Sequence, residues 1–133
     1  METLYDTDKI TIAYDAASNT LITRWSMPAD VDLDLYKAEF VRYRDYILEK
    51  RPDKIFADTI DNQIVITPNL QDWINGVVSG AYRDVGLKKL AVLLSQDFYA
   101  ALSIQQTIED DAGATYKTVF FDDRDKAFQW LSK

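Results

Sequence analysis

The stretch Lys54-Ile55-Phe56-Ala57-Asp58 is a short apolar run of the kind found in buried parallel strands. It lies between two segments with helical patterns. Pro52 ends the first of these segments, because proline cannot continue the hydrogen-bond ladder of a helix. Thr67 and Pro68 begin the second, with the threonine as N-cap and the proline at the first helical position. A buried strand between two helices predicts an α/β fold with parallel pairing.

The rest of the chain repeats this alternation. Residues 9–25 alternate apolar and polar side chains around a turn at residues 15–19, which predicts an antiparallel hairpin. Further strands are predicted at 90–94 and 116–121. We therefore predict a single α/β domain over residues 1–133, with elements in the order ββαβαβαβα. Its sheet would have five strands, mostly parallel, with the hairpin as its antiparallel edge.

Four helices are predicted between and after these strands. The first begins at Asp30 or Asp32, and the second ends near Gly86, which suits a left-handed C-terminal cap. Gly76 and Gly80 lie four residues apart in the second helix, a spacing that lets a helix lie close to a sheet or to a partner. The third helix begins at Ser95 or Asp97 and carries Phe98, Ala101, Leu102, Gln105 and Ile108, and the last begins at Asp122 or Asp123.

No histidine and no cysteine occur among the 133 residues. Their absence removes the side chain that titrates near neutral pH, the thiolate nucleophile and the two commonest transition-metal ligands. No familiar catalytic group of carboxylates, hydroxyls or lysines is visible. We therefore expect no enzyme activity, no cofactor and no metal site. An enzyme would have to use Asp58 or Asp61 as its base.

The formal net charge of −7 at pH 7 disfavours a nucleic-acid partner, because it repels phosphate backbones. No apolar run approaches the roughly 20 residues that a membrane-spanning helix needs. The N-terminal residues are polar and acidic and do not resemble a secretory signal. These features predict a cytoplasmic protein without a membrane span.

Three motifs within this order of elements carry a family resemblance. They are the strand with its Asp-Thr end at 54–59, the helix start Thr67-Pro68-Asn69-Leu70-Gln71-Asp72-Trp73, and the segment 120–131, which runs from a strand through an acidic cap into a terminal helix. Together they resemble the STAS-like family, whose best-known members are bacterial anti-sigma-factor antagonists. The closest resemblance is to a bacterial branch related to both STAS and CRAL-TRIO lipid-transfer domains.

The resemblance implies a regulatory domain. The antagonists carry a phosphorylatable serine at the start of the helix after the third strand. No serine occurs there in this chain, and the nearest positional equivalent is Thr67. Its hydroxyl either accepts a phosphate near the positive end of the helix dipole or simply caps the helix.

The connection 58–68 is the main candidate site, because ligands of open α/β sheets bind beyond the carboxyl ends of the strands. Its apolar triplet, residues 64–66, either forms an extra edge strand, tucks under the sheet, or provides an apolar lip on a pocket or partner surface. The candidate binding and regulatory residues are Asp58, Thr59, Asp61, Asn62, Ile64, Thr67 and Asn69. Tyr82, Phe98 and Tyr99 are candidates for lining a pocket.

Two functions follow from these observations. The leading hypothesis is a non-enzymatic regulatory or protein-interaction domain that acts through the 58–68 loop and the start of the second helix, with a protein partner or a second copy of the chain. The alternative is a carrier or sensor of an apolar, lipid-like small molecule in a pocket beside that loop.

Overall fold

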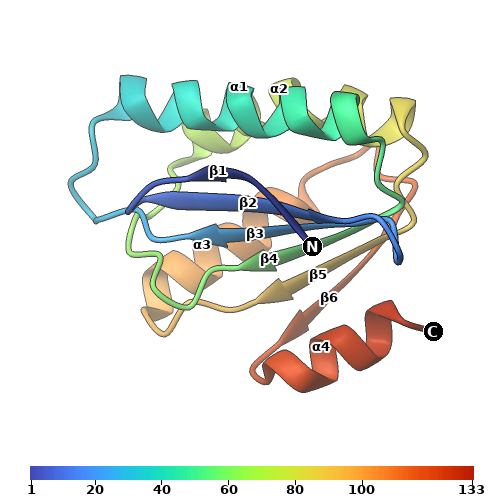
Figure 1. Ribbon diagram of the computed structural model, residues 1–133. Coiled ribbons are helices and arrows are strands. Elements are labelled where there is room, and N and C mark those ends of the chain that lie inside the picture. The colour runs from blue at the N-terminus through green and yellow to red at the C-terminus, as the bar shows by residue number, and fades with distance from the viewer.

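The computed structural model describes residues 1–133 as one six-stranded sheet with four helices (Figure 1). The strands are β1 (Glu2–Asp6), β2 (Ile10–Asp15), β3 (Thr20–Trp25), β4 (Lys54–Asp58), β5 (Lys89–Leu93) and β6 (Lys117–Phe121). The helices are α1 (Leu33–Lys50), α2 (Pro68–Asp84), α3 (Phe98–Glu109) and α4 (Arg124–Leu131). The predicted α/β class is therefore confirmed, and so is the antiparallel hairpin, formed by β2 and β3.

The predicted number of five strands is wrong, because β1 adds a sixth. This strand is polar and largely exposed, so it has no apolar period in the sequence. It forms through antiparallel backbone pairing with β2, with an irregular register between Thr3 and Tyr5. The Tyr46 hydroxyl also donates a hydrogen bond to the Leu4 carbonyl at 3.1 Å. The observed order of elements is βββαβαβαβα.

The strands lie in the sheet in the same order as in the chain, and β3 to β6 are parallel. Each helical connection therefore leads from one parallel strand to the next strand along the sheet, always in the same direction. Right-handed connections of this kind all place their helices on one face of the sheet. Figure 1 shows α1 and α2 together over that face, and Ile104 of α3 belongs to the same core cluster. Because the strand order never reverses, the sheet has no switch point of the kind that opens a ligand crevice in doubly wound folds.

The core is divided between the two faces of the sheet. The larger cluster lies between the sheet and helices α1 to α3. The smaller one, beneath α4, consists of Phe56, Ala91, Leu93, Ala127 and Leu131. Helix α4 follows the last strand, so no crossover constrains it, and it covers the second face only over β4 to β6. None of the four helices combines the length and apolar composition that a membrane span requires.

The helix boundaries follow the predicted caps. Asp32, Thr67, Asp97 and Asp123 are the N-caps of the four helices, and Gly86 has a φ of 67°, as a left-handed residue after a helix does. The prediction of close packing at Gly76 and Gly80 is wrong. Both glycines are exposed, and a Cβ at either would meet no atom within 4 Å.

The apolar face of α3 also differs from the sequence pattern. Phe98 and Leu102 are exposed, whereas Ala100, Ser103, Ile104 and Thr107 are buried. The buried hydroxyls donate to carbonyls within the helix, Ser103 to Ala100 and Thr107 to Ser103. Helix α3 therefore buries a face with mostly small or hydroxyl-bearing side chains, and it leaves the large side chains of Phe98 and Leu102 at the surface.

Candidate functional site

The 58–68 loop lies at the carboxyl end of β4, and its two aspartates are each paired with an arginine. Asp58 lies 3.3 Å from Arg124 of α4 and also accepts a hydrogen bond from the backbone N–H of Ile60. Asp61 pairs with Arg24 at the end of β3, at 2.8 Å. Neither aspartate belongs to a group of three or more potential metal ligands. The arrangement ties the loop to β3 and α4.

Thr59, Asn62 and Ile64 are buried and connect the loop to its neighbours. The Thr59 hydroxyl donates to the Leu93 carbonyl at 2.6 Å, and the Asn62 Oδ1 accepts from the Met27 backbone N–H at 2.9 Å. Ile64 is 3% exposed and belongs to the larger core cluster. The sequence analysis placed these three residues among those that bind a partner, but none of them is available at the surface.

The apolar triplet of the loop tucks into the protein and forms no strand. Ile64 and Ile66 are buried, and the backbone N–H of Ile66 donates to the Ser103 hydroxyl of α3 at 2.9 Å. Val65 between them is 48% exposed. The Ser95 hydroxyl donates to the Asn62 carbonyl, which further joins the loop to the segment before α3. The loop and the start of α3 are therefore neighbours at one end of the sheet.

Large apolar side chains are exposed at this junction. Phe98 and Tyr99 are 70% and 69% exposed, and their rings contact each other edge to face, with centroids 5.4 Å apart. Leu102, one turn further along α3, is also exposed. We call Val65, Phe98, Tyr99 and Leu102 the aromatic patch. Phe98 and Tyr99 were expected to line a pocket, but both side chains lie mostly at the surface, and this exposure was not anticipated from the sequence.

Thr67 and Asn69 are exposed at the start of α2, next to the loop. The Thr67 side chain accepts a hydrogen bond from the backbone N–H of Leu70 at 3.4 Å, so it caps the helix as the sequence predicts. Its hydroxyl is at the same time open to solvent. The loop thus presents Asp61, Val65, Thr67 and Asn69 outward, and it turns its remaining candidate residues inward.

A cavity of about 90 Å³, partly open to its surroundings, lies between the sheet and helices α1 to α3. Thr59, Asn62 and Ile66 bring the inner side of the loop to its wall, and Tyr82 lines it as expected. The other wall residues are Trp25, Tyr36, Phe40, Tyr43, Ala57, Ile74, Asn75, Val78, Leu90, Val92, Ile104, Thr107, Ile108 and Tyr116. None of the lining side chains is charged.

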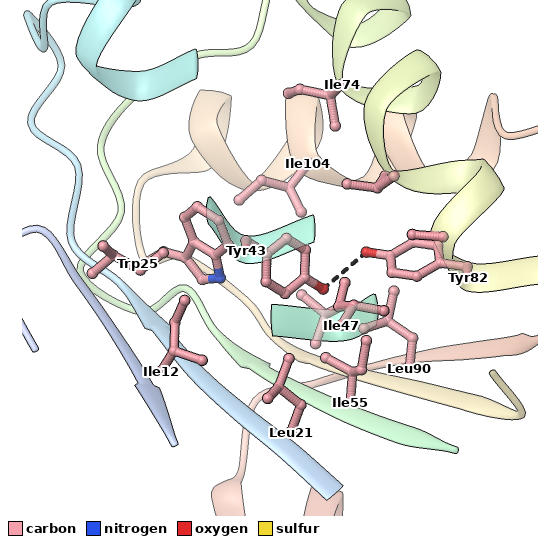
Figure 2. Close-up of a cluster of buried hydrophobic side chains, with 14 of the residues drawn as sticks. Ile12, Leu21, Trp25, Tyr43, Ile47, Ile55, Ile74, Tyr82, Leu90 and Ile104 are labelled. Carbon is pink, nitrogen blue, oxygen red and sulfur yellow. Dashed lines mark hydrogen bonds between the residues drawn. The ribbon is translucent and has the colours of Figure 1, made fainter. Parts of the chain in front are cut away.

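The cavity wall contains a hydrogen-bonded tyrosine pair. The hydroxyl oxygens of Tyr43 from α1 and Tyr82 from α2 lie 2.9 Å apart (Figure 2). Burial raises the pKa of both phenols. Burial also raises the pKa of Tyr36, which has no hydrogen bond to offset the effect. The sequence signal for these groups was the presence of tyrosines on an otherwise apolar helix stripe, since a buried tyrosine usually directs its hydroxyl to a polar partner.

No family model matches the chain, and no curated protein or solved structure is similar to it. The STAS-like resemblance therefore stays a prediction, and the function is argued from the site.

Proposed function

We propose that this protein is a non-enzymatic interaction domain that binds a basic protein segment through the aromatic patch and the outer side of the 58–68 loop. The observation that carries the proposal is the exposure of Phe98 and Tyr99, two aromatic side chains in edge-to-face contact at a junction that is otherwise well packed. Aromatic side chains are enriched in the energetic centres of protein interfaces.

The charge around the patch indicates the kind of partner. Residues 58–82 and 90–116, which contain the loop, most of α2 and all of α3, include no lysine or arginine, and the two arginines at the loop, Arg24 and Arg124, are paired with Asp61 and Asp58. Asp97 directly precedes the patch, and Glu109 and Asp110 end the same helix. A second copy of the chain would present the same acidic surface and be repelled, whereas a basic segment would be attracted.

The polar groups of the loop favour binding over catalysis. Asp58 and Asp61 are engaged by arginines, and the chain offers no histidine or cysteine to act as a base or a nucleophile. Thr67 adds an exposed hydroxyl beside the patch, at which a negative charge would increase attraction for a basic partner.

The alternative hypothesis, a carrier of a lipid-like molecule, has less support. Pockets for ligands of drug size or larger measure roughly 300–1,000 Å³. The cavity of about 90 Å³ is well below that range, so a lipid would need α1, α2 and α3 to move away from the sheet.

Peptide selection tests the proposed function. Short random peptides are displayed on phage, selected on the wild-type protein, and measured by fluorescence anisotropy at low and high salt. We expect the selected peptides to be basic with one or two apolar residues, to bind more weakly at high salt, and to lose about tenfold in affinity to the variant Phe98→Ser/Tyr99→Ser. Thr67→Glu should bind them a few-fold more tightly than Thr67→Ala.

Leu33→Ser is the matched control, because Leu33 is also exposed but lies at the start of α1. It should bind the peptides like the wild type. Selected peptides without excess positive charge, or peptides that bind the Phe98→Ser/Tyr99→Ser protein undiminished, would refute the proposal.

A further inference from the structure

The central strand β4 has an incompletely buried position where a packed core is expected. Ala57 faces the helices, in register between Thr23 of β3 and Val92 of β5, yet it is only partly buried. It lines the cavity between the sheet and the helices. The helices therefore leave space above the middle of the sheet, and this space is independent of the aromatic patch.

The wall of this cavity selects for a neutral ligand. Fourteen of its eighteen lining residues are hydrophobic, and the other four are Thr59, Asn62, Asn75 and Thr107, which carry no charge. An ion would lose its hydration in the cavity without gaining a counter-ion, which is strongly unfavourable. The ligand class is thereby limited to uncharged molecules with mainly apolar surface.

Two buried wall residues have hydrogen-bond donors that the protein does not use. Tyr36 is 1% exposed, and burial alone raises its pKa, with no hydrogen bond of the hydroxyl contributing. The Asn62 side chain is fixed by its Oδ1, which accepts from the Met27 N–H, and this leaves its Nδ2 group without a protein acceptor. Neither donor is among the fully enclosed polar atoms that lack a partner, so each keeps some accessible surface, and a ligand in the cavity can supply the acceptor that the protein does not.

The hydroxyl groups of four other wall residues are already engaged in hydrogen bonds. Tyr43 and Tyr82 bond to each other, Tyr116 donates to Asp111, and the Thr59 hydroxyl donates to the Leu93 carbonyl. Their hydrogen bonds fix the shape of the cavity wall, and these hydroxyl groups require no hydrogen bond from a ligand. The donors that a ligand could satisfy are thus the Tyr36 hydroxyl and the Asn62 side-chain amide.

We propose that the cavity binds a small, neutral carbonyl compound, such as a ketone, an aldehyde or an ester, whose oxygen accepts a hydrogen bond from Tyr36 or Asn62 while its alkyl groups contact the apolar wall. A dry cavity of about 150 Å³ holds benzene. On that scale the present cavity, at about 90 Å³, accommodates roughly four non-hydrogen atoms.

The test compares acetone with 2-methylpropene, in which a methylene group replaces the carbonyl oxygen. Binding is followed by NMR on protein labelled at the isoleucine methyl groups. Ile66, Ile74, Ile104 and Ile108 line the cavity, whereas Ile22 packs on the opposite face with the smaller cluster and serves as an internal control. We expect saturable shifts at the cavity methyls only, with tighter binding of the ketone.

Variants link the shifts to the cavity. Ala57→Ile fills the space on a strand that favours β-branched residues, and it should abolish binding of both compounds. Ala13→Ile is the matched control, because Ala13 lies on β2 with its side chain on the other face, and it should bind like the wild type. Tyr36→Phe should weaken binding of the ketone by roughly three- to tenfold and leave binding of the alkene unchanged.

The absence of saturable shifts in the wild-type protein, or shifts that persist in Ala57→Ile, would overturn the proposal. If Ala57→Ile does not fold, as judged by circular dichroism, Val78→Leu fills the same cavity from α2 by a single methylene group and takes its place. Equal binding of ketone and alkene in the wild type would overturn the assignment of a carbonyl ligand. None of these outcomes depends on peptide binding at the aromatic patch.

Discussion

Removing one hydroxyl of the Tyr43–Tyr82 pair should destabilise the protein more than its own hydrogen bond is worth. The two oxygens lie 2.9 Å apart, and both side chains are buried. Tyr43→Phe leaves the Tyr82 hydroxyl without its partner, and Tyr82→Phe does the same to Tyr43. An unsatisfied buried polar group costs about 1–3 kcal/mol, so we expect each single variant to lose about 1–2 kcal/mol of unfolding free energy.

The double variant should lose less than the sum of the single losses. It removes both polar groups together, so no unpaired hydroxyl remains, and replacement of both partners by apolar groups is nearly neutral. Since the two single losses sum to about 2–4 kcal/mol, we expect a coupling free energy of about 2–3 kcal/mol. The ring contacts are retained in all variants, because phenylalanine preserves the edge-to-face packing of residue 43 on Trp25 and of residue 82 on Tyr116.

Urea unfolding at neutral pH, followed by circular dichroism, measures the four free energies of this cycle. Tyr99→Phe is the control, since its side chain is exposed and its loss should change stability by less than about 0.5 kcal/mol. If the loss of the double variant equals the sum of the single losses within about 0.3 kcal/mol, the two hydroxyls do not stabilise each other, and the hydrogen-bonded pair does not hold the cavity wall together.

Two further predictions concern backbone conformation and pH. Gly76→Ala should stabilise the protein by up to about 1 kcal/mol, because the exposed helix position has room for a methyl group. Gly86→Ala should destabilise the protein by about 1–2 kcal/mol, because a φ of 67° is strained for alanine. Thermal unfolding of both variants tests these opposite signs. Tyr36, Tyr43 and Tyr82 have pKa values raised by burial, so their contribution to stability is complete below the unfolded-state pKa of about 10 and is lost as the pH rises above it, by up to about 4 kcal/mol per pH unit for the three together. Urea midpoints across this range, with tyrosinate absorbance as a second probe, check the direction; stability that is unchanged well above pH 10 would contradict it.

Local patterns predicted most of the secondary structure. Thr67 with Pro68 marks the start of α2, and Gly86 marks its end, because caps depend on residues within one turn of the helix terminus. The strand Lys54–Asp58 was recognised by its apolar run, which reflects burial on both faces. Strand β1 has no such signal, since its stability comes from pairing with β2 and from contacts with α1, such as the hydrogen bond of Tyr5 to Glu39 at 3.0 Å.

The sequence predicted that the 58–68 loop lies at the carboxyl end of a strand, but not which of its side chains are buried. The sequence placed Ile64, Val65 and Ile66 together in one loop, yet the fold buries the first and third and exposes the second. Phe98 was predicted as a candidate for lining a pocket. It lies at the surface because α3 turns its smaller side chains, including Ala100 and Ser103, toward the rest of the domain.

The sequence alone determined the α/β class, the helix caps and the absence of histidine and cysteine chemistry, because these depend on composition and on residues close together in the chain. Only the tertiary structure decided that α1, α2 and α3 share one face of the sheet, that an uncharged cavity remains beneath them, and that Phe98 and Tyr99 stay outside. The physical reason is that burial, cavities and surfaces arise where side chains from distant segments meet, and no local pattern records how well those side chains fill the space between them.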